Sequence, residues 1–113
     1  KLFAVIGACI SLPAYEVDQH LAEHILDKAV TNKLVLLDRQ ALFDMLIKPS
    51  NNSGKAYIDI KRLAQLQLEK FGITVLNDTV PCSYLSPKYY SYRLQTHTNR
   101  PASGRMAMLI IKK

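Results

Sequence analysis

Short apolar runs alternate with amphipathic stretches along this chain. Residues 2–6 form an apolar run that Gly7 closes, a pattern typical of a buried strand. When residues 17–29 are placed at ~100° steps, apolar side chains gather on one side, which predicts a helix after a short extended piece at residues 15–17. Asp18 falls within the apolar arc, so we expect it to cap the start of this helix. The expected apolar face consists of Val17, Leu21, Ala22, Ile25, Leu26 and Ala29.

Two more helices are predicted in the middle of the chain. Asp38 has the side chain of an N-cap and precedes a helix that is expected to end near residue 47. Residues 49–54 contain a proline, two asparagines and a glycine, so we expect an exposed loop there. Asp59 is expected to cap the next helix and Gly72 to end it. The inward-facing residues are expected to be Leu42, Met45 and Leu46 in the first helix, and Ile60, Leu63, Ala64, Leu68 and Phe71 in the second.

The last third of the chain is expected to contain more loop than the rest. Residues 73–76 predict a strand, whereas residues 79–105 hold three prolines and many small polar residues. We expect this segment to be mostly loop, with a short extended piece near residues 89–94. A final strand is predicted at residues 106–111. Because strands alternate with helices and no repeat or linker divides the sequence, we expect residues 1–113 to belong to a single domain of the α+β class, with a mixed sheet flanked by helices.

The composition fits a compact domain. The chain has 113 residues, of which 49% are hydrophobic and 21% charged, and this balance excludes a disordered segment. Its two cysteines are too few for a disulfide framework, so we expect a reducing, cytoplasmic compartment. The chain begins with Lys1 and is expected to be a piece of a longer protein. Residues 1–14 also imitate a secretory signal, which is the alternative to a buried strand. No other stretch has the ~20 apolar residues that a membrane span needs, so no membrane partner is expected.

Positive charge is concentrated in the C-terminal half. The net charge is +6, and residues 57–113 carry nine basic side chains against three acidic ones, whereas residues 1–56 carry six of each. No carboxylate side chain follows residue 79, so this segment favours a nearby anion. The alternative is that acidic residues elsewhere in the fold pair with these basic side chains.

Three residues have the spacing of a zinc site. His20, Glu23 and His24 match the H-x-x-E-H pattern, in which two histidines one helical turn apart bind zinc and the glutamate acts as a base. The helical arithmetic places both histidines on the side that faces solvent. We therefore expect a solvated helix face and no metal ligands in this chain.

Cys82 and His97 could form a nucleophile and its base. Nothing in the sequence shows that the two side chains meet. The alternative for Cys82 is a packed small residue, since free cysteine often behaves as a small hydrophobic side chain. Cys9 follows the first predicted strand and is expected to be structural.

Two arginines are better candidates for binding a ligand than the histidines and cysteines above. Arg93 follows Ser91 and Tyr92, and Arg105 follows a glycine that would let the main chain approach a ligand closely. Arginine presents a fixed fork of donors that matches phosphate or carboxylate oxygens. We expect Arg93 and Arg105 to bind an anion, with Ser91 and Tyr92 as hydrogen-bonding neighbours. The alternative is that both arginines pair with carboxylates of the protein.

Several blocks of residues follow one another in the order and spacing of a known family. They are Ile6-Gly7-Ala8-Cys9-Ile10, Tyr15-Glu16-Val17, Ile58-Asp59-Ile60, Cys82, Ser91-Tyr92-Arg93 and Gly104-Arg105-Met106-Ala107. Together they resemble the C-terminal half of the laccase-domain family. Its members were first described as multicopper polyphenol oxidoreductases and are now regarded as zinc-dependent purine nucleoside enzymes. The chain departs from the family pattern at Ala8, Ser83 and Leu94, and residues 95–103 form a longer connection, which affects the placing of Arg105 relative to Arg93.

The resemblance implies a function for the intact parent protein. It implies phosphorolysis of inosine, adenosine or guanosine, or deamination of adenosine, at a site holding zinc, or copper in older descriptions. The partners would be a purine nucleoside, phosphate and the missing N-terminal half of the same domain. The family's metal ligands, two histidines and a cysteine, would lie in that half. None of them maps onto His20, His24, His97, Cys9 or Cys82, so the chain alone is expected to lack both the metal and the activity.

Two other classes of function remain open at this point. A nucleic-acid-binding module would use the same positive charge against phosphates, but the basic residues are scattered and no recognition motif is present. A non-catalytic structural fragment would bind neither nucleosides nor nucleic acid.

Overall fold

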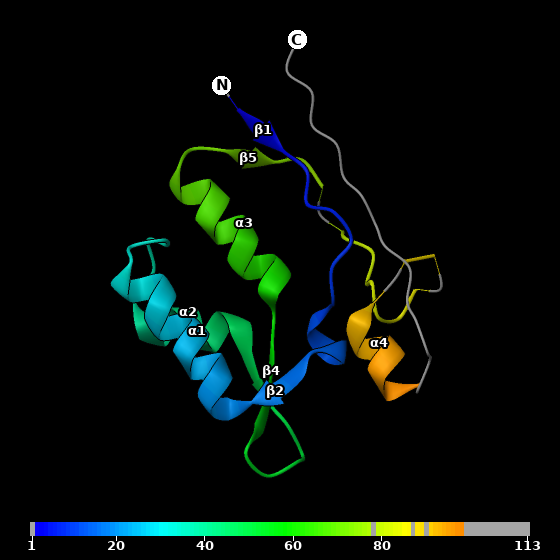
Figure 1. Cartoon of the computed structure of the whole chain (residues 1–113). Helices are drawn as coiled ribbons and strands as arrows, with labels where there is room; N and C mark the ends of the chain where they lie inside the picture. The colour runs from blue at the N-terminus through cyan, green and yellow to red at the C-terminus, as the bar shows by residue number, and fades with distance from the viewer. Residues whose placement is uncertain (1, 78, 87, 90, 99–113) are drawn as a thin grey trace.

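The computed structural model describes residues 2–77, 79–86, 88–89 and 91–98, with Tyr92 described by its backbone alone. Within these ranges, helices are combined with a two-stranded parallel sheet and a three-stranded antiparallel sheet, which confirms the α+β class (Figure 1). The final strand predicted at residues 106–111 lies outside the described residues.

The antiparallel sheet occupies the lower part of Figure 1. Its strands are β2 (Glu16–Asp18), β4 (Lys55–Ile58) and β3 (Ile47–Pro49), in the order β2-β4-β3. The loop that joins β3 and β4 contains Gly54 at φ +73°, a left-handed conformation that glycine adopts without a steric penalty. The loop prediction is therefore confirmed for residues 50–54, but Pro49 belongs to β3.

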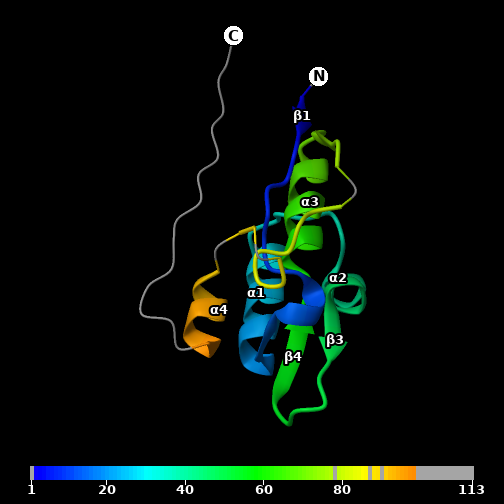
Figure 2. The same cartoon turned by 90° about the vertical axis from the view of Figure 1, so that its right-hand side faces the viewer.

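Three helices build the core against this sheet. They are α1 (Gln19–Thr31), α2 (Arg39–Leu46) and α3 (Ile60–Lys70), and α1 packs against both α2 and β4 (Figures 1 and 2). The buried apolar residues are Val17, Ala22, Leu26, Ala29, Val35, Leu42, Leu46, Ile47, Ala56, Ile58 and Leu63. Apolar burial is the main favourable term in folding, so these contacts fix the position of β2 and the start of α1.

Two of the three predicted aspartate caps form hydrogen bonds. The Asp38 carboxylate accepts one from the Ala41 N–H at 2.8 Å, and Asp59 accepts one from the Arg62 N–H at 3.0 Å. Asp18 occupies the N-cap position of α1 but makes no side-chain capping bond. Its carboxylate binds the Lys55 ammonium across the sheet at 2.6 Å instead.

Three side chains predicted to face inward are exposed. Leu21 in α1 is 44% exposed, Met45 in α2 is 39% exposed and Phe71 is 68% exposed. Each lies at the margin of an apolar stripe, where neighbouring elements decide burial and periodicity does not. Gly72 ends α3 as predicted, at φ +75°.

The first predicted strand is present but is not buried. Strand β1 (Phe3–Ala4) pairs in parallel with β5 (Thr74–Val75), and both strands are shorter than predicted. Phe3 and Val5 are more than half exposed, because β5 is the only strand beside β1 within the described ranges. Asn77 extends the pairing, since its side-chain amide donates to the Ile6 carbonyl and accepts from the Ile6 N–H, both at 3.0 Å.

The described residues include two further short helices. The 3₁₀ helix η1 (Leu12–Ala14) lies in the segment that joins β1 to β2, and α4 (Tyr92–His97) lies beside η1 (Figure 1). The extended piece predicted near residues 89–94 is therefore wrong, because Ser91 caps a helix there. Its hydroxyl accepts a hydrogen bond from the Leu94 N–H at 3.3 Å, which satisfies one donor of the first turn.

Candidate functional site

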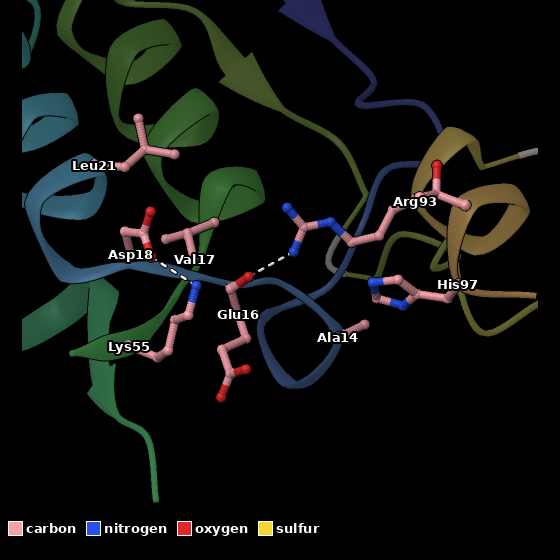
Figure 3. A pocket seen from close by; sticks show the side chains of 9 residues that line it. Ala14, Glu16, Val17, Asp18, Leu21, Lys55, Arg93 and His97 are labelled. Carbon is pink, nitrogen blue, oxygen red and sulfur yellow. Dashed lines mark hydrogen bonds and ion pairs between the residues drawn. The ribbon is translucent and has the colours of Figure 1, made fainter. Parts of the chain in front are cut away.

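An open pocket of about 520 Å³ lies where α4 faces β2 and the start of α1 (Figure 3). Its volume falls within the range of small-molecule sites, roughly 300–1,000 Å³. The lining residues are Ala14, Glu16, Val17, Asp18, Leu21, Lys55, Arg93, Thr96 and His97. The exposure of Leu21 follows from this position, since its side chain forms part of the wall. The pocket thus combines residues of η1, β2 and α1, which are adjacent in the sequence, with residues of β4 and α4, which are distant from them.

Arg93 joins α4 to β2. Its Nη1 donates to the main-chain carbonyl of Glu16 at 2.5 Å (Figure 3). Its guanidinium carbon lies 4.8 Å from the centroid of the Tyr15 ring. A guanidinium has five N–H donors in a fixed plane, so stacking on Tyr15 also fixes the directions of the remaining donors. Among the described residues Arg93 forms no ion pair with a carboxylate.

The Glu16 carboxylate is turned away from Arg93 (Figure 3). It accepts hydrogen bonds from the Ser50 hydroxyl and from the Asn52 side-chain amide, the latter at 2.9 Å. The Ser50 and Asn52 hydrogen bonds lower the pKa of the Glu16 carboxyl, with a smaller contribution from nearby Lys55 and Arg93. Glu16 therefore supplies a carbonyl to the pocket while its negative charge is held by the β3–β4 loop.

An ion pair lies across the pocket from Arg93. The Lys55 ammonium donates to the Asp18 carboxylate at 2.6 Å, and this hydrogen bond with its attraction lowers the pKa of Asp18 (Figure 3). The described wall therefore carries two cations and two anions. Of these, Arg93 is the cation without a carboxylate partner in the described ranges.

His97 lines the pocket, a position that the sequence does not indicate. The sequence offers Cys82 as its partner, but its Nδ1 lies 2.6 Å from the Tyr84 hydroxyl oxygen, and the Tyr84 and His97 rings meet edge to face at 5.5 Å. The imidazole lines the pocket beside Arg93 because the two residues are four apart on α4. That relationship could be found only after α4 was known to be helical.

The other predicted ligand-binding residues have different placements. Ser91 caps α4 and does not line the pocket. Tyr92 begins α4, and Arg105 lies outside the described residues. The hydrogen-bond partners of Cys82 and His97 lie elsewhere, since the Cys82 sulfur accepts from the N–H groups of Ser11 and Leu85 and the His97 ring contacts the Tyr84 hydroxyl. The possible Cys82–His97 pair is therefore not formed, and Cys82 lies in a packed position, which is the alternative that the sequence favoured.

The residues of the H-x-x-E-H pattern do not converge. His20 and His24 are exposed on α1, and Glu23 contacts Arg39 at 3.8 Å. In the part of the chain that the structure describes, no three side chains of His, Cys, Asp or Glu gather as a metal site would require. These residues do not fit a zinc or copper ion.

Comparison with known proteins assigns the family. The model of the multicopper polyphenol oxidoreductase laccase family matches residues 1–113. The chain belongs to this family. A protein of Rickettsia conorii that is named a purine nucleoside phosphorylase is 25% identical over 114 residues, which covers 100% of this chain and 43% of the relative. The chain thus spans less than half the length of the curated relative it matches. No solved structure matches this laccase-family chain.

No helix in the described ranges has both the length and the apolar composition that crossing a bilayer requires.

Proposed function

We propose that this chain forms part of the nucleoside pocket of a purine nucleoside phosphorylase and corresponds to the C-terminal half of the parent domain. The family match and the Rickettsia relative support the activity. The observation that carries the proposal is the position of Arg93, which is brought from 77 residues away to the wall of a pocket of suitable size. We place the intact enzyme in the cytoplasm.

In this proposal Arg93 binds the phosphate that attacks the nucleoside. Phosphorolysis needs fixed cationic donors for phosphate and for the negative charge that develops as the glycosidic bond breaks. Arginine provides paired donors for two oxygens of one phosphate. The contacts with Glu16 and Tyr15 hold the guanidinium before the substrate arrives, which lowers the cost of ordering it.

The remaining parts of the site are assigned as follows. Arg105 is the second anion-binding residue, and Tyr92 is a hydrogen-bonding neighbour. Ser91 acts by positioning, because it caps the helix that carries Arg93. The metal of the family is assigned to residues outside this chain, and none of the steps proposed here passes through it.

The test is phosphorolysis of inosine, adenosine and guanosine by the full-length parent protein and by its Arg93→Ala and Arg105→Ala variants. Phosphate binding by these arginines predicts a larger rise in the KM for phosphate than in the KM for the nucleoside. Arg39→Ala is the matched control, since Arg39 is a partly exposed residue of α2 that pairs with Asp27 and does not line the pocket. Unchanged kinetics in both test variants would remove the arginines from the mechanism.

Tyr15→Leu separates phosphate binding from the docking of α4. It removes the ring beneath the guanidinium and leaves all of the donors of Arg93 in place. We expect a smaller rise in the KM for phosphate than in Arg93→Ala. An equal rise in the KM for phosphate in the two variants would show that Arg93 acts only by holding α4 in place. Absence of nucleoside cleavage by the parent protein would overturn the proposed function itself.

A further inference from the structure

Cys9 and Cys82 are paired neighbours although they lie far apart in the sequence. They form an isolated parallel bridge, in which the Cys9 N–H donates to the Pro81 carbonyl at 3.2 Å and the Ser83 N–H donates to the Cys9 carbonyl at 3.0 Å. Paired strands lie about 4.8 Å apart, within the Cα separations that disulfides span, roughly 4.4–6.8 Å. Residues paired in this way project to the same side. The pairing is a single isolated bridge and is not part of an extended ladder. Small local movements can therefore bring the two sulfurs together.

The surroundings of Cys82 favour its thiolate. Its sulfur accepts hydrogen bonds from the Ser11 N–H at 3.3 Å and the Leu85 N–H at 3.4 Å. Burial raises the pKa of the Cys82 thiol, but the bonds from Ser11 and from the main chain outweigh burial and leave the pKa below its ordinary value.

Ser11 brings a second polar group to this sulfur. Its hydroxyl oxygen is buried, and its side chain is among the groups that lower the pKa of the Cys82 thiol. A buried hydroxyl needs an acceptor, and an anionic sulfur accepts its hydrogen bond more strongly than a neutral thiol does. The residue that already donates its N–H to Cys82 thus carries a second donor beside the same sulfur.

Cys9 has the opposite character. Burial raises the pKa of the Cys9 thiol, and the negative charges of Asp59 and Cys82 raise it further. Cys9 also lines an open pocket of about 310 Å³, so a small molecule can reach this part of the protein. One sulfur is therefore suited to react first and the other to react second, as in redox pairs that contain an attacking and a resolving cysteine.

We propose that Cys9 and Cys82 form a reversible dithiol–disulfide site that reacts with low-molecular-weight disulfides of the glutathione type. The Cys82 thiolate attacks one sulfur of the small disulfide, forms a mixed disulfide and releases one thiolate. The Cys9 thiol then loses its proton to water and attacks the Cys82 sulfur, which expels the second small thiolate. The protein gives up two electrons and two protons, and the small disulfide becomes two thiols.

The disulfide would connect two sides of the pocket that contains Arg93. Cys9 lies two residues before Ser11, which precedes the η1 turn and the pocket residue Ala14. Cys82 lies two residues before Tyr84, whose hydroxyl contacts His97. A covalent bond between the cysteines would thus join the segment before β2 to the segment that holds α4. This inference is independent of the proposed nucleoside chemistry.

The experiment treats the reduced full-length protein with glutathione disulfide and then maps its cysteines by peptide mass spectrometry. We expect a linked peptide pair containing Cys9 and Cys82, about 2 Da lighter than the two reduced peptides together, which dithiothreitol separates again. Alkylation of the reduced protein is expected to be several-fold faster at Cys82 than at Cys9, because the thiolate is the reacting form.

The Cys9→Ser variant tests the order of the two steps. It lacks the resolving thiol, so the glutathione adduct is expected to accumulate on Cys82, whereas Cys82→Ser is expected to leave Cys9 largely unmodified. The wild-type protein alone decides the proposal if either variant fails to fold. Both cysteines remaining alkylatable after the oxidant, or pairing of either with a different cysteine, would overturn it.

Discussion

The guanidinium of Arg93 lies between the Tyr15 ring, at 4.8 Å, and the Glu16 carbonyl, at 2.5 Å, and so attaches α4 to β2. Helix α4 has six residues, too few for stable helix formation in isolation. Its position therefore depends on tertiary contacts, of which Arg93 makes two. The same residue orders the helix and faces the pocket.

Arg93→Ala is expected to loosen α4 without unfolding the core. The lost hydrogen bond and the lost cation–π contact together contribute about 1–2 kcal/mol, and the substitution removes no member of the buried cluster. Hydrogen exchange measured by mass spectrometry should show faster exchange over α4 and unchanged exchange over α1. Arg93→Lys should lie between, since it keeps the charge and loses the planar contact with Tyr15. Unchanged exchange over α4 in both variants would contradict this account.

Leu26 and Leu21 in α1 offer a matched pair of substitutions. Leu26 is fully buried, whereas Leu21 is 44% exposed in the pocket wall. Leu26→Ala is expected to lower the free energy of unfolding by about 2–5 kcal/mol, because it leaves a cavity in the core. Leu21→Ala removes the same atoms and is expected to cost about 0.5 kcal/mol or less. Urea unfolding of both variants measures the difference, and similar losses would mean that α1 has been assigned the wrong buried face.

Substitution of the three aspartates at the helix starts should lower the free energy of unfolding in urea by different amounts. Asp38→Ala and Asp59→Ala each remove a capping bond, and each is expected to cost about 1 kcal/mol. Asp18→Ala removes no capping bond, so its effect should depend on salt, since only the pairing with Lys55 is lost. Asn at positions 38 and 59 should restore most of the stability. An Asp18→Ala loss that salt leaves unchanged would contradict the assignment.

Local patterns in the sequence predicted the helices of the core well. Caps at Asp38 and Asp59 and the turn at Gly72 act within a few residues, so the sequence alone marks where α2 begins and where α3 begins and ends. The β3–β4 hairpin was missed, because β3 follows α2 without a break and its apolar residues continue the helical pattern. The helix at Tyr92–His97 was missed because six residues give too little periodicity.

The candidate site could be predicted only in part, for a different reason. Arg93 was identified from its chemistry, but its partners Tyr15 and Glu16 lie more than 75 residues away, and no local signal connects them. The same holds for the pairing of Cys9 with Cys82. Contacts of this kind are set by tertiary packing, which short-range periodicity does not encode.

The Glu16 carboxylate should make stability depend on pH. Hydrogen bonds from Ser50 and Asn52 lower its pKa in the folded protein below the ordinary value of 4.5. A carboxyl with a lowered folded pKa stabilises the protein fully above its unfolded pKa, and this contribution is lost as the pH falls through the folded pKa. The wild type should therefore exceed Glu16→Gln in stability near neutral pH, and the difference should shrink below the ordinary pKa of a glutamate.

Ser50→Ala, alone and combined with Glu16→Gln, shows whether the Ser50 hydroxyl causes this dependence. Urea unfolding of the four proteins gives the coupling between the two residues, which removes the contribution of other titrating groups such as Asp18. We expect a favourable coupling near neutral pH, because the hydroxyl donates to an ionised carboxylate, and a weaker coupling in acid, where the carboxyl is protonated. A coupling that stays constant from neutral to acidic pH would show that charge on Glu16 does not strengthen the bond, and the β3–β4 loop would then hold β2 by neutral contacts alone.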